Sequence, residues 1–225
     1  MDEAQARRDL VDAILMLERA GIVDFNGHAS VRVAPDRILI NSGRSLRNVL
    51  TEADVVAIDP DGRLVEGDAP PPLEFPIHTG IYRRRPDVGA VIHAHPSWST
   101  VLTIAGHGYT PVYAQGTLLG DVGIFEKVGS VNTPALGAEL AGVLGAGRAA
   151  LIRSHGSVVV GEDLAQAFVL MIHMEENCRR DVLARQIGTP RPFDAEEIAA
   201  ARANLWKPGL FDKTWAYHRA TLRRG

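Results

Sequence analysis

Three of the eight histidines in this sequence stand where predicted strands end, and their type and spacing suit metal binding. His93 and His95 close one apolar run, and His155 follows another. Side chains two positions apart in a strand point to the same face, with Cα atoms about 6 to 7 Å apart, so two imidazoles can reach one ion. Gly156 permits a tight turn and a close backbone approach beside His155. The pattern predicts a metal triad, with hydrogen-bonded histidines at strand ends as the alternative.

A triad of neutral imidazoles leaves one coordination position open for a substrate and keeps the full double positive charge of the ion. Such an ion stabilises negative charge that develops on oxygen, as in an enolate or enediolate. Carbon–carbon cleavage next to a carbonyl group is a reaction of this kind. Imidazole accepts several divalent metals, so the residue types do not by themselves name the ion.

Glu74 is the candidate for proton transfer at this site. It stands at the start of a helix predicted over residues 74–84, between the apolar Leu73 and Phe75, and this setting predicts a raised pKa for its carboxyl group. A fourth ligand to the ion and a carboxylate stabilised by the helix dipole are the alternatives. His78 follows one helical turn later and is expected to contact Glu74 or to pack beneath the site.

The elements that must position these groups follow from periodicity and turn residues. Residues 106–129 are rich in glycine and are expected to be irregular. We predict strands over 29–33, 38–40, 55–58, 63–66, 88–95, 149–152 and 157–160, and helices over 3–20, 74–84, 98–104, 134–144, 164–187, 195–203 and 211–222. This order lacks the strict alternation of a doubly wound sheet. It predicts an α/β fold of three layers, with a mainly antiparallel sheet covered by helices, in a single domain of residues 1–225.

Composition excludes several classes of function. The net charge is −3, and 24 basic residues are scattered among 27 acidic ones, so we expect no nucleic-acid partner. No apolar stretch approaches the roughly 20 residues that cross a bilayer, and the N-terminus has no signal-peptide pattern. We therefore expect no membrane association and a cytoplasmic location. The single cysteine, Cys178, is expected to be structural.

Four segments make the chain similar to the class II aldolase/adducin family: residues 27–32, Ser42-Gly43, residues 74–96 and Ser154-His155-Gly156. The resemblance implies one divalent ion per subunit, usually zinc, with manganese, cobalt or iron as alternatives. It implies that His93, His95 and His155 bind this ion and that Glu74 acts as acid and base. Adducin heads lack this complete set, so its presence favours an enzyme.

The phosphate site of the sugar-phosphate aldolases is altered here. Gly27-His28 stands where they have Gly-Asn, and Pro72-Leu73 stands where they have a Ser-Ser pair, so two sources of hydrogen bonds to phosphate are changed. These variants resemble the decarboxylase-like members, which act on hydroxylated aromatic or heteroaromatic carboxylates.

The segments around the altered positions predict the substrate contacts. The residues expected to bind the substrate or its acidic group are Gly27, His28, Ser42, the backbone of Gly43, and Arg44. The alternative for Arg44 and for Arg47, three residues later, is that both are exposed charges, and the residue type favours this alternative.

The resemblance also implies a homotetramer in which a neighbouring subunit supplies a tyrosine as proton donor. Gln115 stands near that position, and Tyr109, Tyr113 and Tyr217 are the substitutes that this chain offers.

The predicted function is that of a divalent-metal-dependent carbon–carbon lyase, an aldolase acting on a sugar or hydroxy-carbonyl substrate. The alternatives are a metal-dependent decarboxylase, a non-haem iron oxygenase and a non-catalytic adducin-like interaction domain.

Overall fold

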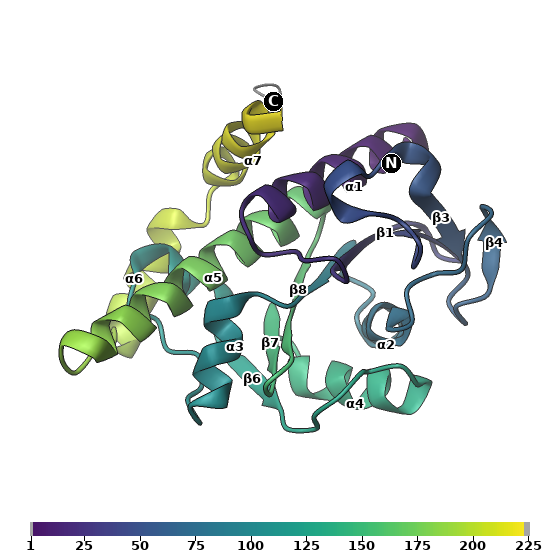
Figure 1. Ribbon diagram of the computed structural model, residues 1–225. Helices are drawn as coiled ribbons and strands as arrows, with labels where there is room; N and C mark the ends of the chain where they lie inside the picture. Colours follow the sequence, from purple (N-terminus) through teal and green to yellow (C-terminus); the bar gives the residue numbers. More distant parts are fainter. Residues whose placement is uncertain (1, 223–225) are drawn as a thin grey trace.

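The computed structural model describes residues 2–222 and places eight strands in one sheet between two layers of helices (Figure 1). The order in the sheet is β4-β3-β2-β1-β5-β8-β7-β6, and neighbours are antiparallel except for the parallel pair of β6 and β7. The predicted α/β fold, with three layers and a mainly antiparallel sheet, is therefore confirmed. The strands are β1 (His28–Ala34), β2 (Arg37–Asn41), β3 (Val55–Ile58), β4 (Leu64–Glu66), β5 (Ala90–Ala94), β6 (Val122–Phe125), β7 (Ala149–Ile152) and β8 (Gly156–Gly161).

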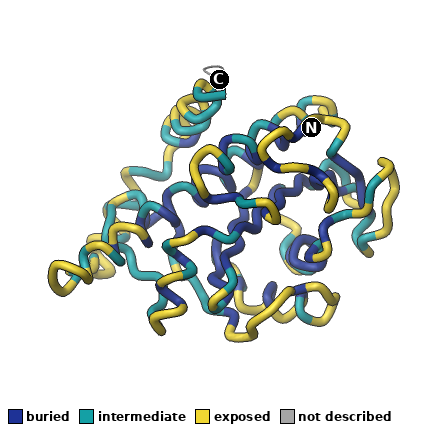
Figure 2. Tube along the Cα trace, viewed as in Figure 1, coloured by how far each residue is buried: buried dark blue, intermediate teal, exposed yellow. Residues whose placement is uncertain are grey.

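Two separate apolar cores lie on the two faces of the sheet. One is formed with α1 and α5, together with residues of α3 and α7, and the other with α2 and α4. Figure 2 shows that the buried part of the chain follows the central strands between these layers. The helices are α1 (Glu3–Arg19), α2 (Phe75–Arg84), α3 (Ser97–Ile104), α4 (Pro134–Leu144), α5 (Leu164–Ile187), α6 (Ala195–Leu205) and α7 (Pro208–Leu222).

Alternation along β1 decides which side chains face the candidate site. Ala29 and Val31 belong to the core under α1 and α5. Because successive side chains in a strand point to opposite faces, His28 and Ser30 face α2 instead. In α2, His78 lies on the face turned toward these two residues and is completely buried. The polar residues near the site therefore lie between β1 and α2.

Glycines allow α2 to pack closely on α4. A Cβ atom at Gly80 would lie 2.6 Å from the backbone of Gly137, which is too close for any side chain. The two helix backbones therefore meet directly at this point, and this contact sets the distance between α2 and α4.

The prediction of an irregular segment over residues 106–129 was wrong in part. The segment contains β6 and a 3-10 helix over Ala114–Leu119. Strand β6 has four residues, one of them Gly123, and it pairs in parallel with β7, which follows it after α4. So short a strand carries little local signal, and its pairing depends on distant residues. None of the described helices combines the length and the apolar character that spanning a membrane requires.

Candidate metal centre

Four side chains from separate elements converge at one end of the central strands. His93 lies in β5, His95 just beyond it, His155 in the turn between β7 and β8, and Glu74 at the N-cap of α2. One atom from each lies within 4.8 Å of the others. His95 Nε2 is 3.2 Å from Nε2 of His93 and 3.1 Å from Nε2 of His155. A tetrahedral zinc ion with bonds of 2.0 to 2.1 Å would separate its ligands by about 3.3 to 3.4 Å, so the spacing fits such an ion.

The outer nitrogen of each ring is already engaged. His93 Nδ1 donates to the carbonyl of Ser157 at 3.0 Å, and His155 Nδ1 donates to the carbonyl of Gly129 at 2.9 Å. His95 Nδ1 lies 3.2 Å from both carboxylate oxygens of Asp24.

These contacts decide the tautomers of the three rings. A carbonyl or carboxylate oxygen accepts a hydrogen bond, so the proton of each neutral ring sits on Nδ1 and each Nε2 presents a lone pair to the cluster. Three such nitrogens repel one another unless a cation or added protons lie between them. The donor set therefore fits a divalent ion.

The turn that carries His155 depends on two unusual backbone positions. A Cβ atom at Gly156 would lie 2.2 Å from the carbonyl oxygen of Ala94, so the close approach predicted for this glycine is confirmed. Ser154 adopts φ 57°, a left-handed conformation that is uncommon outside glycine, and its N–H donates to Thr103 Oγ1 at 2.9 Å. The turn brings His155 back over the end of β5.

The carboxylate of Glu74 faces the histidines and does not cap α2. Oε1 accepts the backbone N–H of Val131 at 2.7 Å, and Oε2 lies 3.4 Å from His93 Nε2 and 3.6 Å from His155 Nε2. The predicted rise in pKa was wrong. Burial does raise the pKa of this carboxyl, but the interactions with His155 and His93 in their protonated forms and the hydrogen bond from the Val131 N–H outweigh it, so the pKa lies well below its usual range.

The pKa values of the histidines differ because their surroundings differ. A hydrogen bond with Glu74 raises the pKa of His155, whereas burial lowers the pKa of His93. Burial also lowers the pKa of His28, and that of His78 to about 3. His155 therefore accepts a proton more readily than His93.

Asp24 is a site residue that sequence reasoning missed. It lies in the loop between α1 and β1, where neither spacing nor a motif sets it apart. The backbone around Gly129 and Val131, which holds His155 and Glu74, was missed for the same reason. Only folding brings these loops over the strand ends.

The predicted substrate residues divide into two groups. His28 and Gly43 line a cavity of about 180 Å³ together with Glu74. Gly27 and Ser42 instead accept hydrogen bonds through their carbonyls from Arg47, at 2.6 and 3.2 Å. The other residues that line this cavity are Asn26, Arg47, Pro72, Leu73 and Ser130.

Two expectations for this loop need correction. The backbone N–H of Gly43 is not free for an anion, because it donates to the carbonyl of Pro70 at 2.8 Å. Arg47 is not an exposed charge, because it is 96% buried, with 4% relative exposure, and lines the cavity. Arg44 is exposed and is not among the residues that line the cavity. The three-residue 3-10 helix over Arg47–Val49 turns Arg47 inward, and no local pattern of residues indicates this turn.

Comparison with known proteins shows the family of the chain. A family model described as Class II Aldolase and Adducin N-terminal domain matches residues 8–182. The chain belongs to the class II aldolase and adducin family.

Relatives within the class II aldolase and adducin family include both decarboxylases and aldolases. The chain is 31% identical over 190 residues to 3,4-dihydroxyphthalate decarboxylase of Arthrobacter keyseri, which covers 78% of this chain and 77% of the relative. It is 28% identical over 197 residues to the 5-methylthioribulose-1-phosphate/5-deoxyribulose-1-phosphate aldolase of Rhodospirillum rubrum, covering 85% of this chain and 87% of the relative. A solved L-fuculose 1-phosphate aldolase superposes with a TM-score of 0.83 at 25% identity, covering 91% of this chain and 97% of that one.

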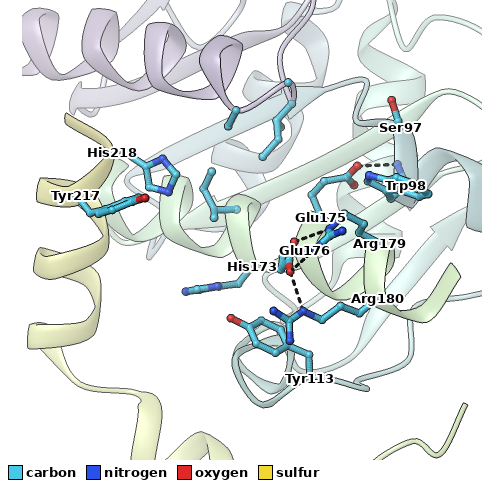
Figure 3. A pocket seen from close by; sticks show the side chains of 14 residues that line it. Ser97, Trp98, Tyr113, His173, Glu175, Glu176, Arg179, Arg180, Tyr217 and His218 are labelled. Atoms are coloured by element: carbon cyan, nitrogen blue, oxygen red, sulfur yellow. Dashed lines mark hydrogen bonds and ion pairs between the residues drawn. The ribbon is translucent and has the colours of Figure 1, made fainter. Parts of the chain in front are cut away.

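The three tyrosines predicted as possible proton donors do not lie at the metal-ligand cluster of their own subunit. Tyr109 is largely buried and donates to the carbonyl of Gly116 at 2.8 Å. Tyr113 and Tyr217 line a separate cavity of about 610 Å³ beside α5 and α7. Figure 3 shows Tyr217 on α7 across this cavity from Tyr113, which lies under Arg180. None of these three tyrosines is among the described residues that line the cavities next to Glu74.

Proposed function

We propose that this protein is a divalent-metal-dependent carbon–carbon lyase whose ion is held by His93, His95 and His155. The observation that carries the proposal is the convergence of three Nε2 lone pairs, each oriented by an acceptor on Nδ1. Glu74 adds a carboxylate at the same point. Family membership supports a lyase, because the relatives include aldolases and decarboxylases.

A divalent ion bound here, zinc first and manganese, cobalt or iron as alternatives, would supply a Lewis acid that stabilises negative charge on a substrate oxygen. Glu74 would move the proton. Its Oε1 is anchored by the N–H of Val131 while Oε2 faces the cluster. In an aldol cleavage Glu74 would take the proton of the substrate hydroxyl group, and a proton would return to the released carbon.

The adjoining cavity suits an acidic group on the substrate. Arg47 is buried there, and no carboxylate among residues 2–222 forms an ion pair with it. Its Nε and Nη1 donate to carbonyl oxygens, whereas Nη2 donates to none of the described residues. A buried guanidinium without a carboxylate partner attracts an anion. A carboxylate or phosphate near His28 and Arg47 is therefore part of the proposal.

Decarboxylation is the second candidate reaction, and the cavity wall favours it. Pro72 has no backbone donor, and Leu73 adds none from its side chain, so this wall offers a phosphate little beyond Arg47 and His28. Loss of carbon dioxide also leaves an electron pair that a carbonyl oxygen can accept, and Glu74 would relay a proton from the substrate hydroxyl group or from water to the carbon that has lost the carboxyl group. The metal cluster suits either reaction.

A second copy of the chain is proposed to complete the site. Phe25, Leu46 and Leu73 line the cavities around the cluster, yet their relative exposures are 79%, 68% and 69%. Large apolar side chains grouped at a polar cavity are typical of a surface that is covered in an assembly. A homotetramer is the assembly we propose, and a neighbouring tyrosine is then available as donor.

Incubation of zinc-loaded protein with a panel of sugar phosphates and hydroxylated aromatic carboxylates tests the proposal. Release of an aldehyde identifies an aldolase, and release of carbon dioxide identifies a decarboxylase. Activity should disappear after chelation and return with added zinc or manganese. Tight metal binding without turnover of any compound in either class would count against a lyase.

Two other functions predict different results in the same samples. A non-haem iron oxygenase would consume oxygen when loaded with ferrous ion. An adducin-like interaction domain would contain no stoichiometric metal by elemental analysis after purification without chelators.

A further inference from the structure

Four buried polar side chains form a continuous hydrogen-bonded chain behind the cavity wall. His28 Nδ1 lies 2.7 Å from His78 Nε2, and His78 Nδ1 lies 2.6 Å from Ser30 Oγ. Ser30 Oγ lies 2.9 Å from the hydroxyl of Tyr82. All four residues are buried, and we call them the His28–Tyr82 chain. Its outer end, His28, lines the cavity that also contains Arg47.

The elements explain why these groups meet. His28 and Ser30 are two positions apart on β1 and share the face of the sheet turned toward α2. His78 and Tyr82 are four positions apart on α2 and lie one above the other. Glu74 lies four positions before His78, so one side of α2 serves both the metal cluster and the chain.

The distances give the chain a direction. The Tyr82 hydroxyl can donate to Ser30 Oγ at 2.9 Å or to the Gly89 carbonyl at 3.4 Å. Tyr82 has one hydroxyl proton, and good O–H···O bonds span about 2.5 to 3.0 Å. The proton is therefore donated to Ser30 and not to the more distant carbonyl of Gly89. Ser30 then donates to His78 Nδ1, and His78 Nε2–H donates to His28 Nδ1. Because Nδ1 of neutral His28 accepts a bond, its proton must sit on Nε2.

The free nitrogen of His28 is placed to meet a ligand. His28 Nε2 has no hydrogen-bond partner among the described residues, and the ring borders the cavity beside Arg47. A carboxylate or phosphate oxygen only accepts hydrogen bonds. A chain running in the opposite direction would present a lone pair to that oxygen and would disfavour binding. Burial raises the pKa of the Tyr82 phenol, which keeps the donor end of the chain protonated.

We propose that Ser30, His78 and Tyr82 are positioning residues that hold His28 as the Nε2–H tautomer, so that it donates to an anionic oxygen of the ligand in this cavity. The tautomer of His28 follows from the hydrogen bonds of the His28–Tyr82 chain alone. The claim that the anion belongs to a lyase substrate rests on the proposed function.

Nitrogen-15 spectra of zinc-loaded, imidazole-labelled protein test the tautomer without any substrate. The wild type should carry its His28 proton on Nε2. Ser30→Ala removes the donor to His78 and should shift a measurable share of that proton to Nδ1. Ser30→Thr, which restores a hydroxyl, should keep the wild-type form as the major one. Tyr82→Phe removes the group that donates to Ser30 and should shift a smaller share of the proton than Ser30→Ala does.

Ser99→Ala, which changes a buried serine outside the chain, is the matched control and should leave the His28 signals unchanged. A proton on Nδ1 of His28 in the wild type would overturn the proposal. So would a folded Ser30→Ala protein with the wild-type tautomer. The wild-type spectrum is decisive even where a variant does not fold.

Titration with inorganic phosphate and, separately, with benzoate identifies the acid class. The anion that the cavity accepts should shift the His28 Nε2–H signal and should bind about tenfold or more weakly to Ser30→Ala, as expected for a hydrogen bond to a charged group. If neither anion moves this signal, the ligand half of the proposal fails. If His28 carries its proton on Nε2 but the protein has no lyase activity, the proposed function is rejected and the proposed tautomer stands.

Discussion

His28 and His93 are direct partners in the antiparallel pairing of β1 with β5, and their ring centroids lie 5.0 Å apart. His93 belongs to the metal-ligand cluster, and His28 ends the chain that leads to Tyr82. The two groups of residues therefore share one wall, and an ion and an acidic group would lie side by side.

Replacing His155 with alanine should remove the metal and the activity but leave the fold intact. The side chain lies in a turn and is half-buried, so we expect the free energy of unfolding of the metal-free protein to change by about 1 kcal/mol or less. Zinc affinity should fall by more than about 100-fold, beyond the effect of residues that merely orient a ligand. Elemental analysis and circular dichroism measure both. His107→Ala is the matched control, and zinc at one ion per chain in His155→Ala would remove this residue from the site.

Glu74→Gln should keep the metal and lose turnover. Glutamine has nearly the same shape, and its carbonyl oxygen can still accept the N–H of Val131, so the geometry should persist. A side chain that transfers protons contributes about 100- to 10,000-fold to the rate, and kcat should fall by this factor. The exposed pair Glu176–Arg179 offers a control in Glu176→Gln. If the zinc content of Glu74→Gln fell by the same factor as kcat, Glu74 would be assigned as a ligand to the metal.

Asp24→Ala should weaken metal binding without changing a ligand. The carboxylate holds Nδ1 of His95 at 3.2 Å and so fixes the direction of its Nε2. Loss of such an orienting partner typically costs about 10- to 100-fold in metal affinity. Competition with a chelator measures the metal affinity. Asp24→Asn should lose less affinity than Asp24→Ala, because its amide oxygen can still accept the hydrogen bond from His95. The same affinity in Asp24→Ala as in the exposed control Asp36→Ala would contradict the assigned role.

Leu73→Asp should break the proposed homotetramer. A charge at this exposed apolar position at the cavity would have to be buried without a partner in an interface. Light scattering coupled to size exclusion should show a smaller species, with loss of activity if a neighbour completes the site. Ile187→Asp alters a side chain that is 92% exposed at the end of α5 and is the matched control. A wild-type monomer with full activity would rule the assembly out.

His173 should make the protein less stable as the pH falls from about 6.5 to about 4. Burial lowers the pKa of this ring from 6.5 to about 4, so in this window the unfolded chain binds a proton that the folded chain rejects. The free energy of unfolding should therefore fall with decreasing pH, by at most about 1.4 kcal/mol per pH unit from this group. Urea denaturation in the presence of chelator at pH 7 and pH 5 measures the loss.

The comparison variant for this effect is His173→Gln. Its loss of stability between the two pH values should be smaller than that of the wild type, because the other buried histidines are common to both proteins. An identical loss in the two proteins would show that His173 does not contribute.

The sequence by itself indicated the metal-ligand candidates and most of the elements that carry them. His93 and His95 follow the strand period, and His155 stands beside Gly156, where a Cβ atom would lie 2.2 Å from the carbonyl oxygen of Ala94. Apolar periodicity predicted the long helices, and the order of the predicted elements indicated a mainly antiparallel sheet. These features depend on residues close together in the chain, where side-chain direction follows from local backbone geometry.

Tertiary structure decided what the candidate residues can do. The pKa of Glu74 is low because groups from β5, from the turn before β8 and from the loop at Val131 surround it, and no local pattern encodes that combination. Arg47 is buried and Arg44 is exposed although they are three residues apart, because a 3-10 turn directs Arg47 inward and three backbone carbonyls accept its hydrogen bonds. The tautomer of His28 depends on a helix some fifty residues away in the sequence. The spacing of residues in the sequence determines only the direction in which a side chain points. Burial and hydrogen-bond partners are properties of the packed molecule, and they determine the charge of a side chain, its tautomer and its accessibility to a ligand.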